Sequence, residues 1–209
     1  MTTATAVPAI IPLSLLEAIR NLDTPVEDGL EELAEEIVVR RLGLSPTVAA
    51  QIQRYRQAAD RDVAIDLDEV VSVLRLVGRR ADAPLVFADA GRRAARLAAR
   101  SGARPARTLA KMSPAGVGRR IALRAAARLS HDVFGGDLLA RSQGTEVSMY
   151  DPLSILALPD GAACAFFGAA YGELLRSLTA FEGAMIHEQC RSRGGEACVW
   201  RSAPAEVYE

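Results

Sequence analysis

Apolar residues in the first eighty positions recur at helical spacing, with charged residues between them. Segment 24–43 has leucine, isoleucine and valine on one side and glutamates on the other, and begins with a capping box and a proline. Ser45 followed by proline starts a second predicted helix, 46–60, and a third covers 66–80. No catalytic arrangement of residues stands out here. We therefore expect residues 1–82 to form a helical docking or dimerisation segment, through which the chain pairs as a homodimer.

The pattern changes from residue 83 onwards. Helical spacing predicts three further helices, 87–99, 114–129 and 162–178, and the helical period ends at 131–136. Alternation of apolar and polar residues predicts strands in three segments, 137–157 (two or three strands), 184–187 and 197–201. The predicted fold class is α+β: a helical N-terminal segment followed by a small antiparallel sheet packed against helices, with the second part covering residues 83–209.

The composition fits a folded protein without a membrane span. The chain has 209 residues, of which 50% are hydrophobic, so it can bury a core. It has no apolar run long enough to cross a bilayer, and its start lacks the basic leader and cleavage site of a signal peptide. Three cysteines without secretion signals favour a reducing compartment and metal binding over disulfides. We therefore expect a cytoplasmic protein.

Positive charge is concentrated in one stretch of the chain. The net charge is −1, but residues 75–128 carry +12 and the rest carries −13. Such asymmetry is compatible with a nucleic-acid interface, with docking against the acidic first segment, or with a solvated face. The stretch has few aromatic residues and no recognisable DNA-binding motif, so we do not expect nucleic-acid binding.

Cys164, His187, Cys190 and Cys198 include every cysteine of the chain and one of its two histidines. Three thiolates and an imidazole are a common donor set for a closed, tetrahedral zinc site. A hairpin through the glycine pair between the last two cysteines can bring these two together, and Cys164 falls at the start of the predicted helix 162–178. The alternative is that Cys164 is a small core residue.

The segment from residue 83 to Trp200 resembles the 4-vinyl reductase-type domain. The resemblance rests on Cys164-Ala165-Phe166-Phe167-Gly168 with Tyr171-Gly172, and on Cys190, the glycine pair, Cys198 and Trp200. The family includes a protein once assigned to bacteriochlorophyll vinyl reduction and the sensory domains of phenol- and xylene-responsive regulators. Its fold is similar to that of small subunits of the transport-protein-particle tether.

The resemblance implies a structural Zn²⁺ held by Cys164, His187, Cys190 and Cys198, with histidine where the sensors have glutamate. Glu188 is the alternative ligand, but neighbouring strand residues point to opposite faces, and we prefer His187. A closed shell of four ligands leaves no position for a reactive water. The resemblance also implies a pocket for a hydrophobic, aromatic or tetrapyrrole-like molecule. Its candidate contacts, each of which can equally be a core residue, are Phe134, Met149, Tyr150, Phe166, Phe167, Tyr171 and Met185.

The predicted function is therefore that of a small-molecule sensor or carrier. An enzyme of (bacterio)chlorophyll synthesis is the first alternative, although the chain has no dinucleotide fingerprint, phosphate loop or catalytic triad pattern. A regulator or a structural interaction module that acts through a protein partner or DNA is the second. The phenol sensors contact their ligand through a histidine and a tryptophan that precede the first zinc ligand. In this chain the only tryptophan, Trp200, follows the zinc ligands, and His131 is the only upstream histidine. A phenol pocket of the sensor type therefore does not carry over.

Overall fold

The computed structural model describes residues 5–24, 45–141 and 144–205, and the fold is α+β as predicted. The described residues of the N-terminal part form the helices α1 (Ile10–Asp23), α3 (Pro46–Asp60) and α4 (Leu67–Gly78) and a short antiparallel strand pair, β1 (Ala6–Pro8) and β2 (Ala64–Asp66). The remaining helices are α5 (Ala83–Gly102), α6 (Arg104–Met112), α7 (Ala115–Phe134), α8 (Leu153–Ala157) and α9 (Cys164–Thr179). The four main strands are β3 (Asp137–Arg141), β4 (Gly144–Met149), β5 (Gly183–Gln189) and β6 (Cys198–Pro204).

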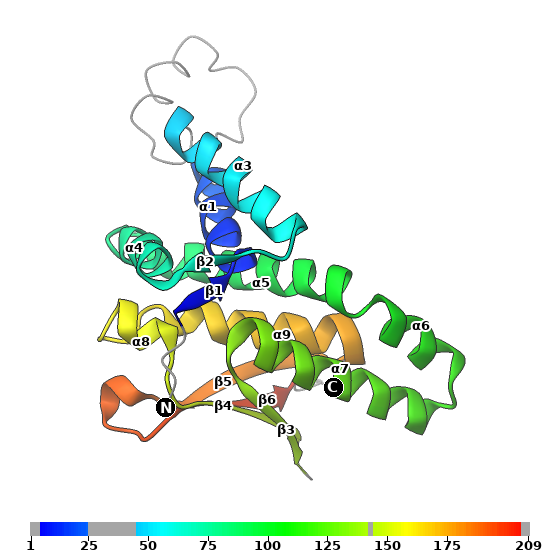
Figure 1. Cartoon of the computed structure of the whole chain (residues 1–209). Helices are drawn as coiled ribbons and strands as arrows, with labels where there is room; N and C mark the ends of the chain where they lie inside the picture. The colour runs from blue at the N-terminus through cyan, green and yellow to red at the C-terminus, as the bar shows by residue number, and fades with distance from the viewer. Residues whose placement is uncertain (1–4, 25–44, 142–143, 206–209) are drawn as a thin grey trace, which may run out of the picture.

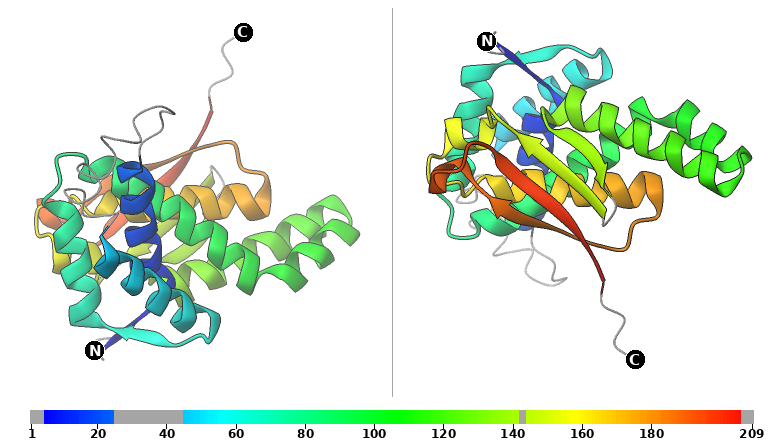
Figure 2. Two further views of the ribbon diagram at one scale, coloured as in Figure 1. Left: turned by 90° about the horizontal axis from the view of Figure 1, so that it is seen from above. Right: turned by 90° about the horizontal axis from the view of Figure 1, so that it is seen from below.

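The four main strands form one antiparallel sheet with the order β3-β4-β6-β5. Helix α9 packs against one face of this sheet and α5 crosses α9 on its other side, so the sheet, α9 and α5 form successive layers (Figure 1). Helices α1, α3 and α4 lie beyond α5. Seen from below, none of the described helices covers the opposite face of the sheet (Figure 2). Because β5 is the last strand in the order β3-β4-β6-β5, it is an edge strand, and it lies beside α9.

Helices α5 and α9 approach each other until their backbones touch. An added Cβ at Gly91 of α5 would lie only 2.1 Å from the carbonyl oxygen of Phe166 in α9. Buried alanines line the same side of α5, among them Ala90, Ala94 and Ala98. Small residues at this crossing let the two helices pack closely, which fixes the position of α9 and hence of Cys164 at its start.

The core is continuous from the N-terminal helices to the sheet, so one set of buried residues spans the predicted division at 82/83. That division stays a prediction about function. Beneath the sheet, five aromatic rings pack against one another with centroid separations of 5.1–6.4 Å: Phe134, Phe166, Phe167, Tyr171 and Trp200. Each is at most 3% exposed. This cluster holds α7, α9 and β6 together.

Several predicted elements are confirmed. The second helix begins after Ser45, whose hydroxyl accepts a hydrogen bond from the Val48 N–H over 3.3 Å. The terminal hairpin forms from the predicted strands: β5 extends beyond the predicted segment at both ends, whereas β6 starts one residue later than predicted and runs on to Pro204. The predicted helix 24–43 lies outside the described residues, apart from Thr24.

Other predictions were wrong. The helix predicted to end at residue 129 is α7, which continues through His131 to Phe134. It ends there because Gly135 caps it with a left-handed backbone (φ 70°), and the Ser130 hydroxyl donates a hydrogen bond to the Gly136 carbonyl over 2.6 Å. Segment 153–157 is the short helix α8, which starts after Pro152, and not a strand. Helix α6 and the β1–β2 pair were not predicted. None of the described helices is long and apolar enough to cross a membrane.

Candidate metal centre

The predicted ligands come together from three parts of the chain. Cys164 is the first residue of α9, His187 lies near the end of β5, Cys190 follows that strand, and Cys198 begins β6. One ligand atom from each residue can be chosen so that all lie within 4.8 Å of one another. The three cysteines are at most 4% exposed, and His187 is half-buried. The group is therefore a buried Cys3His cluster at the junction of helix and hairpin.

A β-bulge makes this arrangement compatible with strand geometry. Residues three apart in a regular strand, such as His187 and Cys190, point to opposite faces. The register shifts here: His187 pairs with Trp200 and Gln189 with Val199, which leaves one extra residue between them. The extra residue changes the alternation, so that both potential ligands face the helix.

The extra residue of the bulge is Glu188, which does not approach the cluster. Its carboxylate is exposed and pairs with Arg201 at 3.0 Å. Arg201 also pairs with Glu146 at 2.9 Å. Because neighbouring residues of a strand point to opposite faces, Arg201 lies on the face opposite to its buried neighbour Trp200. The geometry therefore presents His187 to the three sulfur atoms, while Glu188 belongs to a surface ion-pair network.

The separations between the sulfur atoms fit zinc coordination. A tetrahedral zinc ion with Zn–S bonds of about 2.3 Å places its sulfur ligands about 3.8 Å apart. The Sγ–Sγ distances are 3.7 Å for Cys190 and Cys198, 3.9 Å for Cys164 and Cys190, and 4.0 Å for Cys164 and Cys198. A disulfide needs sulfur atoms about 2.05 Å apart, and all three cysteines are free. The sulfur atoms thus already lie close to three corners of a metal–thiolate tetrahedron.

His187 completes the donor set with an unused nitrogen. Its Nε2 is buried and has no hydrogen-bond partner among the described residues. The ring stacks on Trp200 with a centroid distance of 4.7 Å and an angle of 11° between the planes, which fixes its orientation. A buried nitrogen without a partner is energetically unfavourable unless another group, such as a metal ion, takes its lone pair.

Burial governs the protonation of the cluster in the absence of a cation. Burial raises the pKa of Cys164, against the opposing effect of the Ser154 hydroxyl, and burial likewise raises the pKa of Cys198. Burial also lowers the pKa of His187, helped by the charge of Arg193, so the imidazole is neutral and able to donate a lone pair. Three buried thiolates are costly without positive charge nearby, and a divalent cation supplies that charge.

Each sulfur atom also has a hydrogen-bonding neighbour outside the cluster. The Ser154 hydroxyl lies 3.3 Å from Cys164 Sγ, and the Ser192 hydroxyl lies 3.0 Å from Cys190 Sγ. The Arg191 N–H donates to Cys198 Sγ over 3.5 Å. Although burial opposes it, the hydrogen bonds from Ser192 lower the pKa of Cys190. Such neighbours orient metal ligands and stabilise thiolates.

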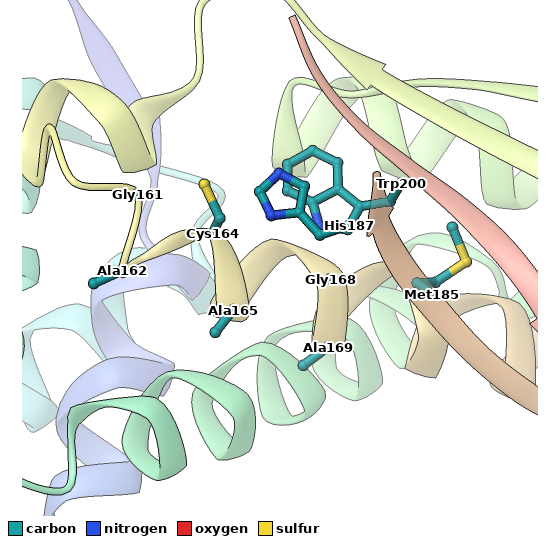
Figure 3. A pocket seen from close by; sticks show the side chains of 9 residues that line it. All are labelled: Gly161, Ala162, Cys164, Ala165, Gly168, Ala169, Met185, His187 and Trp200. Atoms are coloured by element: carbon teal, nitrogen blue, oxygen red, sulfur yellow. The ribbon is translucent and has the colours of Figure 1, made fainter. Parts of the chain in front are cut away.

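A pocket of about 370 Å³ opens beside the cluster, between the first half of α9 and strand β5 (Figure 3). Small residues of α9 and the turn before it form one wall: Gly161, Ala162, Ala165, Gly168 and Ala169. Met185, His187 and Trp200 form the other wall, and Cys164 lies at one end. Gly168 leaves room for Trp200, because a Cβ there would lie 3.0 Å from the indole nitrogen.

The predicted ligand contacts are distributed between this pocket and the core. Met185 lines the pocket, whereas Tyr150 is 59% exposed elsewhere on the surface. The other five are buried and do not line it: Phe134, Met149, Phe166, Phe167 and Tyr171. The Tyr171 hydroxyl is buried without a hydrogen-bond partner among the described residues, and burial raises its pKa.

Sequence reasoning missed Trp200 as a pocket residue, although it is paired directly with His187 in the hairpin. Cross-strand partners share a face, but the pairing depends on the bulge at Glu188, which the sequence does not reveal. Ser154 and Ser192 were also missed. Ser192, two residues after Cys190, could have been suspected, but nothing in the sequence places Ser154 near Cys164.

Comparison of the chain with protein-family models, curated proteins and solved structures finds no match. The resemblance to the 4-vinyl reductase-type domain therefore stays a prediction. What the structure itself shows is a Cys3His cluster whose residues could bind a metal ion.

Proposed function

We propose that this protein is a small-molecule-binding module with a structural zinc ion beside its ligand pocket. The observation that carries the proposal is the Cys3His cluster, with sulfur atoms 3.7–4.0 Å apart and the orphaned Nε2 of His187. Donors of this type and geometry favour zinc over calcium or magnesium, which prefer oxygen ligands. Four protein ligands fill a tetrahedral shell, so the metal would join α9 to the hairpin.

The pocket beside the cluster supports binding of a compact ligand that presents both apolar and polar surface. Its volume of about 370 Å³ lies at the lower end of the range for small-molecule sites, which favours a one- or two-ring compound over a tetrapyrrole. The small side chains of α9 form one wall, Met185 lies on the opposite wall, and a planar ring can lie against the α9 wall beside Trp200. We infer a sensor or carrier, because the pocket would lie beside a fully coordinated metal and its lining offers no acid–base pair.

Mass spectrometry of the purified protein under native and denaturing conditions tests both parts. One zinc ion per chain, absent from Cys190→Ser, supports the metal site. An organic mass that is released on denaturation identifies the ligand class directly. Metal-free protein that does not take up added zinc would overturn the proposal.

Fluorescence gives a second test of the pocket, because Trp200 is the only tryptophan of the chain and lines the pocket. We expect 2-naphthol, as a two-ring probe, to change its emission saturably. Ala169→Leu fills the pocket and should weaken this response, whereas Ala184→Leu, exposed and outside the pocket on the same strand as Met185, should not. An equal response in both variants would place the probe elsewhere and argue against this pocket.

A further inference from the structure

Helix α6 buries none of its side chains. It forms a hairpin with the first half of α7, and this hairpin projects beyond the rest of the molecule (Figure 2). A nine-residue helix is too short to be stable by itself in water, and most helices gain stability by burying an apolar face. The apolar residues of α6 lack such burial within the described part of the chain.

The exposed apolar residues gather at the tip of the hairpin. Met112 is 81% exposed, Leu109 is 57% exposed, and Val117, at the start of α7, is 49% exposed. The side of α6 that faces α7 is occupied by Ala110, whose carbonyl oxygen would lie 2.5 Å from a Cβ at Gly118. The helices are in backbone contact there, so the larger apolar side chains remain outside the interface.

The same hairpin is strongly cationic. Residues 104–128 contain seven Lys and Arg, and no acidic residue occurs between positions 90 and 131. In the described structure the one ion pair recorded for these seven cations joins Arg128 to Asp132 at 3.2 Å. The hairpin therefore combines exposed apolar side chains with cations that, apart from Arg128, form no ion pair within the described part of the chain, in a protein with a net charge of −1.

We propose that the α6–α7 hairpin docks onto the surface of an anionic phospholipid membrane. Leu109, Met112 and Val117 would enter the headgroup region, and the surrounding cations would contact lipid phosphates. Apolar residues flanked by Lys and Arg on a short amphipathic helix are the pattern of interfacial membrane binding. Anionic lipids attract such a segment locally, even where the whole protein is nearly neutral.

Two other partners fit these observations less well. A nucleic acid would match the charge, but the hairpin has no aromatic residue between positions 104 and 128 to stack on bases, and its apolar tip would gain nothing from a polar backbone. A second copy docked through the same hairpin would bring two cationic surfaces together. The lipid surface is the partner that uses both features.

Co-sedimentation of the full chain with vesicles tests the proposal. We expect binding to vesicles of phosphatidylglycerol and phosphatidylcholine, about tenfold or more stronger than to phosphatidylcholine alone, and weakened by salt. Arg119→Glu/Arg120→Glu should abolish the preference for the anionic lipid. The control Arg61→Glu/Arg79→Glu changes the net charge equally at exposed sites outside the hairpin and should retain the preference.

The apolar tip is tested separately. Leu109→Ser/Met112→Ser should lower binding to the anionic vesicles several-fold, whereas Leu85→Ser/Leu156→Ser, which alters exposed leucines elsewhere, should not. All these positions are exposed, and circular dichroism checks that each variant is folded. Equal binding to both kinds of vesicle, equal loss in the control variants, or binding of duplex DNA or self-association through the hairpin without vesicle binding would each overturn the proposal.

Discussion

Replacement of Cys198 by serine removes a predicted metal ligand with little change in side-chain volume. Cys198 is fully buried, and its Sγ lies 3.7 Å and 4.0 Å from the sulfur atoms of Cys190 and Cys164. The serine hydroxyl can still accept the hydrogen bond that Arg191 donates to the sulfur. The packing is therefore nearly conserved, and the main loss is the free energy that metal binding adds to folding.

The size of this loss follows from linkage. A ligand that binds only the folded state, at a free concentration of 100 times its Kd, stabilises that state by about 2.7 kcal/mol. For a chain of about 200 residues, 1 kcal/mol corresponds to roughly 2–4 °C in Tm. Because the three thiols already lie at tetrahedral separations, little of this free energy is spent on rearrangement. We expect chelation to lower the Tm of the wild-type protein by about 5–10 °C.

Scanning calorimetry with added zinc and with a chelator measures this difference. The wild-type Tm should fall on chelation, whereas Cys198→Ser should melt at the same low temperature in both conditions. Val70→Thr is the control: it places a hydroxyl at a fully buried site on α4, so it should lower Tm but keep the response to chelation. A wild-type Tm that does not respond to zinc or chelator would refute the argument.

Three further predictions concern the scaffold. Gly91→Ala should lower the free energy of unfolding by about 1–3 kcal/mol in urea titrations, because its Cβ would meet the Phe166 carbonyl, and unchanged stability would contradict the close crossing. Tyr171→Phe should raise the free energy of unfolding by about 1 kcal/mol, since the substitution removes a buried hydroxyl that has no hydrogen-bond partner among the described residues. A lower free energy of unfolding would indicate that the hydroxyl does form a hydrogen bond. Hydrogen bonds from Arg80 lower the pKa of Asp82, so its contribution to stability is present above the unfolded pKa of about 3.9 and is lost as the pH falls through the folded value. Asp82→Asn should therefore reduce the acid-induced loss of stability between neutral and low pH, and an unchanged pH profile would rule out this linkage.

Elements governed by local signals were predictable. Ser45 and the following proline define a helix start in both the sequence and the structure, because a cap satisfies N–H groups of the same turn. The cysteines and His187 could be selected by residue type alone, since these donors are few in the chain. The end of α7 failed as a prediction, because it depends on the left-handed conformation of Gly135, which the sequence permits but does not require.

Contacts between distant segments were not predictable in the same way. The Cys164 thiol meets Ser154 because α8 folds back beside α9, and α9 is positioned by its crossing with α5 at Gly91. The orientation of His187 depends on stacking with Trp200 and on the bulge at Glu188. These features depend on packing across long sequence separations, which a hydrophobic pattern does not encode.

The sequence by itself determined the α+β class, the concentration of positive charge in residues 75–128 and the identity of four potential metal ligands. Periodicity, charge and donor chemistry are local properties of the chain, and they persist whatever the tertiary arrangement. The tertiary structure alone decided that three thiols lie 3.7–4.0 Å apart, that a pocket lies beside them, and that α6 leaves its apolar residues exposed. Those features arise where separate elements meet or fail to meet, because burial is determined by the neighbours that a residue acquires in the folded chain.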